Sequence, residues 1–298
     1  MLIDTFKKGS SIRNSSLNRG EPPMFPILHK RALNASVSLM EVEAPYIARK
    51  ARAGQFIILR VNETGERIPL TIADHDTERG TITIMYQKVG KTTLLLDTLA
   101  AGDAILDVVG PLGRATELEG CRRVAVVGGG VGCAIAYPEA KAAHQAGAQV
   151  DMIAGFRNRD IVMLEDEFRT VSDRLYIMTD DGSYGEKGFV TVKLQELLDA
   201  GETYDLVIAI GPLPMMRAVA GVTKPYGIKT LVSMNPIMID GTGMCGGCRL
   251  TVGGETKFAC VDGPEFDAHQ VDWDEAMKRL TQYREEEHAC RLRFTGEA

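Results

Sequence analysis

The sequence predicts a multidomain protein of the β plus α/β class. An antiparallel β-barrel or sandwich comes first, a parallel-sheet α/β domain follows, and a small cysteine-bearing domain ends the chain. Short alternating apolar runs extend to about residue 113, after which strands, glycine turns and helices follow one another. Three of the six cysteines then fall within residues 245–260. The 298 residues also exceed the usual size of a single hydrophobic core.

Residues 1–23 form a polar segment rich in Ser, Asn, Gly and Pro. A segment of this composition buries too little apolar surface to fold alone. We therefore predict a flexible extension, with structure beginning near Met24.

The charge balance excludes several classes of partner. The chain carries 40 acidic and 34 basic residues, a net charge of −6 that is spread along its length, which is not the footprint of a nucleic-acid-binding or membrane-binding surface. It has neither an apolar run of roughly 18 to 20 residues nor the apolar core of a secretory signal. We expect a cytoplasmic protein whose partners are small molecules and proteins.

The predicted barrel or sandwich covers residues 24–118, with strands in FIILRV (56–61) and TITIMYQKV (81–89). Within it, GERIPLTIAD (65–74) places a proline and Thr71 at a strand edge. KVGKTTLLLDTL (88–99) places a glycine, a lysine and two threonines before a helical run, a combination suited to a diphosphate. Each segment could equally be a plain strand end or a helix cap.

The α/β domain is predicted at residues 119–232. Strands are expected at 122–129, 149–156, 174–181, 204–212 and 229–234, and helices at 134–147, 164–172, 190–201 and from Pro214. This alternation is typical of a parallel sheet.

Two glycine turns make this sheet a candidate nucleotide-binding domain. VVGGGVGCAIA (126–136) ends a strand and opens a helix, so its glycines let a diphosphate approach free N–H groups. AIGPLPMM (209–216) ends a later strand, and we expect the two turns to face each other across one cleft. The alternative is that both are simple turns that bind nothing.

The third unit, residues 233–298, holds Cys245, Cys248 and Cys260 in a glycine-rich C-x2-C-x11-C loop and closes with a charged helix near 273–287. Thiolates at this spacing can share a metal, and glycines leave N–H groups free to bond cluster sulfides. Zinc is the competing occupant, with His269 as the nearest fourth ligand. Cys121, Cys133 and Cys290 are interpreted as structural thiols.

Taken together, GQFIILRV, ERIPLTIAD, VGKTT, VVGPLG, VVGGGVG, IAIGP and MCGGC…CVDGP make residues 24–298 resemble the ferredoxin–NADP reductase superfamily. The branch it resembles holds the electron-transfer subunit of dihydroorotate dehydrogenase and the small subunits of sulfide dehydrogenase and NADH-dependent reduced ferredoxin:NADP oxidoreductase. The resemblance implies an FAD-binding barrel, an NAD-binding α/β domain and a C-terminal 2Fe-2S domain. It implies a subunit that takes hydride from NAD(H) and passes electrons to a larger flavin and iron–sulfur subunit binding NADP(H). Ferredoxin would react on that partner in an electron-bifurcating complex.

The resemblance also assigns residues. Thr71 would lie beside the isoalloxazine as the catalytic residue, among the flavin contacts Arg67, Pro69, Leu70 and Ile72. The FAD diphosphate would lie on Gly90, Lys91, Thr92 and Thr93. The nicotinamide dinucleotide would lie between Gly128, Gly129, Gly130, Val131 and Gly132 on one side and Gly211 and Pro212 on the other.

Four positions bear on the cofactor contacts. Ile68 stands where the wider superfamily has an arginine, with Arg67 one position early. Arg157 and Arg159 could bind the 2′-phosphate that distinguishes NADP from NAD, or they could face solvent. The resemblance implies NAD.

Asp240 replaces the first of the four cluster cysteines of the dihydroorotate branch and gives D-x4-C-x2-C-x11-C, as in the small subunits of the bifurcating transhydrogenase and sulfide dehydrogenase. We predict Asp240, Cys245, Cys248 and Cys260 as the cluster ligands, the alternative being that Asp240 caps a turn and Cys290 or a partner residue completes the site. The alternative functions are the electron-transfer subunit of dihydroorotate dehydrogenase or sulfide dehydrogenase, and a non-enzymatic zinc-knot scaffold.

Overall fold

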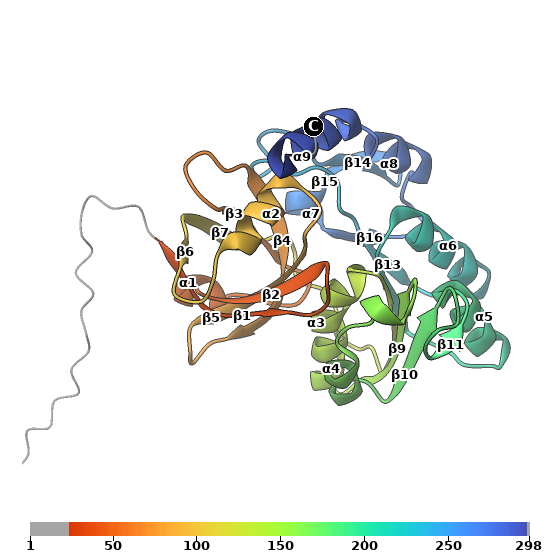
Figure 1. Cartoon of the computed structure of the whole chain (residues 1–298). Helices are drawn as coiled ribbons and strands as arrows, with labels where there is room; N and C mark the ends of the chain where they lie inside the picture. Colours follow the sequence, from red (N-terminus) through yellow and green to blue (C-terminus); the bar gives the residue numbers. More distant parts are fainter. Residues whose placement is uncertain (1–23, 297–298) are drawn as a thin grey trace, which may run out of the picture.

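The computed structural model describes residues 24–296, so the predicted extension at residues 1–23 lies outside the described residues. Figure 1 shows the barrel and the α/β layer side by side, with the C-terminal segment running across the top of both. No helix within residues 24–296 is long and apolar enough to cross a membrane.

The first sheet is antiparallel and curls into a nearly closed barrel. In the described chain its strand order is β6-β1-β2-β5-β4-β3-β7. Its inward side chains, among them Ile57, Leu59 and Ile84, are almost fully buried. Its elements are β1 (Phe25–Ala32), β2 (Val37–Glu43), α1 (Pro45–Ala48), β3 (Phe56–Arg60), β4 (Arg67–Asp76), β5 (Thr81–Gln87), α2 (Lys91–Thr98), β6 (Ala104–Ile105) and β7 (Asp107–Leu112).

The second sheet is parallel apart from its last strand and has the order β11-β10-β9-β8-β12-β13-β16 in the described chain. The chain runs outward from β8 through β9 and β10, then returns to place β12 on the other side of β8, so the switch point of the sheet lies between β8 and β12. Its strands are β8 (Arg123–Gly129), β9 (Gln149–Phe156), β10 (Arg174–Thr179), β11 (Glu186–Lys187), β12 (Leu206–Ile210), β13 (Thr230–Ser233) and β16 (Glu265–Asp267).

Helices cover this sheet and join it to the barrel. Helix α3 packs on β8 and also on β4 of the barrel, where Lys141 Nζ lies 2.7 Å from Asp74 Oδ1. The helices are α3 (Gly132–Gln145), η1 (Arg159–Ile161), α4 (Glu165–Thr170), α5 (Val190–Asp199), α6 (Leu213–Thr223) and η2 (Lys224–Tyr226).

The C-terminal segment is built into both larger units. It holds β14 (Arg249–Val252), β15 (Glu255–Phe258), α7 (Ala259–Asp262), β16, α8 (Trp273–Arg279) and α9 (Arg284–Thr295). Strand β16 pairs with β13 of the second sheet, and the Gly263 carbonyl accepts a 2.7 Å hydrogen bond from Arg114 N at the end of the barrel. The domain boundaries at residues 118 and 232 stay predictions. The pairing of β13 with β16 joins the segments on either side of residue 232.

The charged helix predicted at 273–287 is wrong in one respect, since two helices occupy that stretch. Asp272 caps α8 by accepting a 3.0 Å hydrogen bond from Glu275 N. A turn follows, and Tyr283 adopts a left-handed backbone with φ of 64° before α9 starts. No glycine or proline marks this break, so the sequence pattern gave no sign of it.

Candidate functional site

A cleft of about 1180 Å3 lies where the barrel meets the switch point of the parallel sheet. Ligand pockets commonly measure roughly 300 to 1,000 Å3, so this cleft has room for a large ligand or two smaller ones. Its walls come from β4 and β5 on the barrel side, and from the start of α3 and the end of β12 on the other.

The barrel wall contains Pro69, Leu70 and Thr71 of β4, three of the predicted flavin contacts. The Thr71 hydroxyl forms no hydrogen bond within the described residues and is therefore available to a ligand. The other two predicted contacts lie apart. Ile72 is only 2% exposed and packs in the barrel core, and the Arg67 guanidinium lies 3.3 Å from Asp107 Oδ2.

The predicted diphosphate segment forms the start of α2. Thr93 lines the cleft, and its hydroxyl accepts hydrogen bonds of 3.1 Å from the N–H groups of Val89 and Gly90. Thr92 instead donates to Glu66 Oε2 at 3.2 Å. The cleft wall does not include Gly90, Lys91 and Thr92, which lie at the start of α2.

The two predicted glycine turns both line the cleft, but they lie directly against each other instead of on opposite sides of it. Gly128 is the register partner of Ile210 in the β8–β12 pair. A Cβ added to Gly211 would lie 3.2 Å from the Gly129 Cα, and one added to Gly132 would lie 2.3 Å from the Ile210 carbonyl oxygen. Side chains at these positions would force the turns apart. The turn residues that line the cleft are Gly129, Gly130, Val131, Gly132, Gly211 and Pro212.

Several lining residues escaped the sequence reasoning. Tyr86 of β5 is one, and burial raises the pKa of its phenol, with Asp97 adding to the effect. Asp180 follows the end of β10, a position that the rule on strand ends could have identified. Arg157 lines the cleft, whereas Arg159 lies over the Tyr184 ring at 5.5 Å.

Two carboxyl groups with buried oxygens belong to residues close in sequence to the cleft lining. Ile135 and Pro264 line the cleft. Glu139 lies one helical turn after Ile135 on α3, and Glu265 directly follows Pro264. Glu139 Oε2, Glu265 Oε1 and Thr116 Oγ1 are all buried without a hydrogen-bond partner among the described residues. Burial raises the pKa of Glu139 well above its usual value, with the Glu265 charge as a second cause, and burial raises the pKa of Glu265 to about 7.

The cysteine loop places two of its three thiols together. Cys248 Sγ and Cys260 Sγ lie 3.2 Å apart in a buried setting, while Cys245 is exposed. Backbone N–H groups point at sulfur, from Gly247 to Cys245 Sγ at 3.4 Å and from Cys260 to Cys248 Sγ at 3.5 Å. Burial and the neighbouring Cys248 thiol raise the pKa of Cys260 to about 12. Soft thiols with N–H donors at sulfur fit an iron–sulfur cluster.

The Asp240 side chain organises this loop by accepting hydrogen bonds from other residues of the loop. Its carboxylate accepts hydrogen bonds from the Thr242 hydroxyl, from Cys245 N at 2.8 Å and from Thr242 N at 2.6 Å. These contacts, the Thr242 hydroxyl foremost, hold the pKa of Asp240 well below the usual range. In the described part of the chain no three His, Cys, Asp or Glu side chains gather as a ready metal site. The role of Asp240 as fourth ligand therefore stays a prediction.

The remaining candidates lie away from the loop. His269 Nε2 is 3.1 Å from the Ile228 carbonyl oxygen, so the fourth ligand of the zinc alternative is engaged elsewhere. Cys133 is buried beside Gly128, and burial raises its pKa to about 12.

Comparison with known proteins first defines the class. A ferredoxin NADP+ reductase from Neisseria gonorrhoeae matches with a TM-score of 0.52 and 14% identity, covering 69% of this chain and 91% of that one. The barrel and parallel sheet with a cleft between them thus define a ferredoxin-reductase-like fold.

The family follows from closer matches. Residues 235–272 match the model of the iron-sulfur cluster binding domain of dihydroorotate dehydrogenase B. The dihydroorotate dehydrogenase B (NAD(+)) electron transfer subunit homolog of Thermotoga maritima is 49% identical over 85% of this chain and 89% of its own. A chain in the structure of NADH-dependent reduced ferredoxin-NADP oxidoreductase matches with a TM-score of 0.86 and 45% identity, over 93% of this chain and 99% of that one. The chain belongs to the family of dihydroorotate dehydrogenase B electron-transfer subunits and their homologues, which confirms the resemblance drawn from its motifs.

Proposed function

We propose that the chain is an electron-transfer oxidoreductase subunit that passes electrons between NAD(H), FAD and a 2Fe-2S cluster. Its acceptor is a larger flavin and iron–sulfur subunit that binds NADP(H), within a ferredoxin-linked, electron-bifurcating complex. One observation carries the proposal: a single cleft joins Pro69, Leu70 and Thr71 of the barrel to both glycine turns of the α/β sheet. The 45% identity with a chain of the NADH-dependent oxidoreductase supports the same function.

The residues of the cleft suit two ligands that must meet. Thr71 offers a free hydroxyl on the barrel side, and Gly130, which has no atom within 4 Å of the place where a Cβ would be, leaves its backbone open on the other. Val131 and Gly132 begin α3, where free N–H groups favour a diphosphate. A flavin bound here would accept a hydride and release its electrons singly.

The cysteine loop would hold the cluster through Cys245, Cys248 and Cys260, with Asp240 as the proposed fourth ligand. The thiols must lose their protons to bind iron, so cluster assembly would release protons from the buried Cys248–Cys260 pair. The Gly247 N–H that points at Cys245 Sγ would stabilise the thiolate charge.

The test is cofactor analysis of the full chain purified without air from its native cells, together with whatever copurifies. We expect FAD, iron and sulfide in the chain, flavin reduction by NADH, and a larger flavin and iron–sulfur partner. A colourless, zinc-containing chain that NADH does not reduce would contradict the proposal and leave the zinc-knot scaffold.

A second candidate, the electron-transfer subunit of dihydroorotate dehydrogenase, is favoured by the family match at residues 235–272. Asp240 weighs against it, because that branch carries a cysteine at this position. Copurification with a dihydroorotate-oxidising subunit would decide in its favour.

A further inference from the structure

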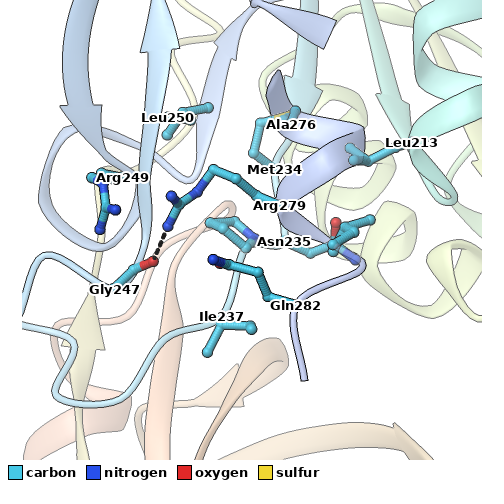
Figure 2. A pocket seen from close by; sticks show the side chains of 12 residues that line it. Leu213, Met234, Asn235, Ile237, Gly247, Arg249, Leu250, Ala276, Arg279 and Gln282 are labelled. Carbon is cyan, nitrogen blue, oxygen red and sulfur yellow. Dashed lines mark hydrogen bonds between the residues drawn. The ribbon is translucent and has the colours of Figure 1, made fainter. Parts of the chain in front are cut away.

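Two arginines contact the peptide groups between Cys245 and Cys248. The Gly246 carbonyl accepts a hydrogen bond from Arg249 Nη1 at 3.2 Å, and the Gly247 carbonyl accepts one from Arg279 Nη2 at 3.1 Å. Figure 2 shows the Arg279 side chain reaching from α8 to Gly247, beside the small pocket that it lines. Two consecutive carbonyls of the cysteine loop therefore each accept from a guanidinium.

The opposite side of the loop faces sulfur. The N–H of Gly247 belongs to the same peptide group as the Gly246 carbonyl, and it donates to Cys245 Sγ at 3.4 Å. A hydrogen bond accepted by a carbonyl polarises its peptide group, so Arg249 strengthens the Gly247 N–H as a donor. Arg279 acts on the next peptide group, that of the Gly247 carbonyl and the Cys248 N–H, so its influence on the sulfurs rests on its charge. Hydrogen bonds to sulfur and nearby charge are two of the factors that set the reduction potential of an iron–sulfur cluster.

The two arginines differ in their surroundings. Both line a pocket of about 20 Å3, which has room for little more than one water, but Arg249 is exposed and Arg279 is half-buried. Arg279 Nε is buried without a hydrogen-bond partner in the part of the chain that the structure describes. Among those residues neither guanidinium pairs with a carboxylate. Because burial reduces screening by solvent, the charge of Arg279 acts more strongly on its surroundings than that of Arg249.

We propose that Arg279 is a positioning residue that raises the reduction potential of the iron–sulfur cluster held by the cysteine loop. It fixes the Gly247 carbonyl and places an uncompensated positive charge next to the loop. Reduction adds one electron, supplied through the flavin from NADH, and no bond forms or breaks; the added negative charge is stabilised by the guanidinium. This inference rests on the proposed function.

The test uses the full chain reconstituted with ferrous iron and sulfide, and measures the midpoint potential of the cluster by redox titration with electron paramagnetic resonance detection. Arg279→Met and Arg279→Gln should lower the potential by about 59 mV, which corresponds to a tenfold change in the one-electron equilibrium. Arg279→Lys keeps the charge and should remain near the wild type. Arg249→Met is the matched control, for which we expect a clearly smaller shift.

An unchanged potential in Arg279→Met would overturn the inference, as would a shift in Arg279→Lys as large as that in Arg279→Gln. If Arg279→Met binds no iron, the Lys and Gln variants decide by the same criterion, and loss of the cluster from both would show a purely structural role. A wild-type chain that binds no iron and sulfide contradicts the proposed function and the inference together. If the wild-type chain binds the cluster but the variants do not show the expected potentials, only the inference is contradicted.

Discussion

Thr71 is a half-buried residue of β4 that lines the cleft, and its hydroxyl has no partner among the described residues. Thr71→Val keeps the shape of the side chain and removes a hydrogen bond worth roughly 1 kcal/mol. We expect flavin reduction by NADH to slow about five- to tenfold in stopped-flow measurements, while FAD is retained. The control is Thr83→Val, a half-buried threonine of neighbouring β5 that does not line the cleft. Equal rates in the two variants would remove Thr71 from the site.

Gly130 lines the cleft with a φ of +58°, and no atom lies within 4 Å of the place where its Cβ would be. A valine there would project into space that the dinucleotide needs, besides straining the backbone. Gly130→Val should abolish flavin reduction by NADH and leave the flavin and cluster spectra unchanged.

Gly147→Val separates strain from obstruction, because Gly147 has a φ of +85°, equally open space at its Cβ and a position outside the cleft. It should lose stability but keep its reaction with NADH. Normal NADH reactivity in Gly130→Val would place the dinucleotide elsewhere.

Asp240 has both a structural and a proposed ligand role, and variants distinguish them. Asp240→Cys should keep a 2Fe-2S cluster with a changed paramagnetic resonance signal, because sulfur is a softer ligand than oxygen. Asp240→Ala should weaken or lose the cluster, and Cys290→Ala should have no effect. Unaltered spectra in both Asp240 variants would show that Asp240 only caps a turn, through its hydrogen bonds from Thr242 N and Cys245 N.

At the scale of elements, Asp97 fastens α2 to the barrel. Its carboxylate accepts hydrogen bonds from Ser38 Oγ at 2.7 Å and from the Tyr86 hydroxyl at 3.1 Å, and it lies 3.1 Å from Lys30 Nζ. Burial works to raise the pKa of Asp97, but these partners outweigh it and the pKa is lowered. Helix α2 carries Thr93, so its attachment bears on the cleft.

Removing this carboxylate should loosen the helix. We expect Asp97→Ala to lower the free energy of unfolding by about 2 kcal/mol in urea titrations and to weaken FAD retention. Asp97→Asn preserves the shape and should cost less. Because the pKa of Asp97 is lowered in the fold, its contribution is present at neutral pH and lost as pH falls through that lowered pKa. Full stability in Asp97→Ala would show that α2 is held by its apolar contacts alone.

At the scale of the whole molecule, Glu139 and Glu265 lie where α3, the barrel end near Thr116 and the C-terminal segment meet. Burial raises the pKa of Glu265 to about 7, so the folded chain binds a proton that the unfolded chain releases near its ordinary value of 4.5. The proton-bound form therefore stabilises the fold at low pH, and that stability is lost as pH rises from about 4.5 through about 7.

Glu265→Gln mimics the protonated acid and should flatten this decline, gaining up to about 3 kcal/mol over the wild type above pH 8. Chemical unfolding at a series of pH values measures it. Glu63→Gln, on the exposed surface, should follow the wild type. A wild-type stability that does not fall across the window would mean that Glu265 is ionised in the fold without cost.

Much of the fold could be predicted because it is encoded locally. The buried run at residues 122–129 and the glycines after it became β8 and the turn into α3, since a strand and a helix start are specified by neighbouring residues. The spacing of Cys245, Cys248 and Cys260 likewise singled out the loop that the family match covers. The outward or inward direction of Ile72 and Arg67 was not encoded in this way, because it depends on the curl of the barrel.

The sequence by itself determined the order of barrel, parallel sheet and cysteine segment, the two glycine turns and the chemistry of the thiols, because periodicity and spacing act over a few residues. Only the tertiary structure decided which residues meet. It set Gly211 against Gly129, buried Glu139 beside Glu265, carried Arg279 to Gly247 and turned His269 to Ile228. These contacts join positions between about 30 and 130 residues apart, and their geometry follows from how whole elements pack, which no local pattern contains.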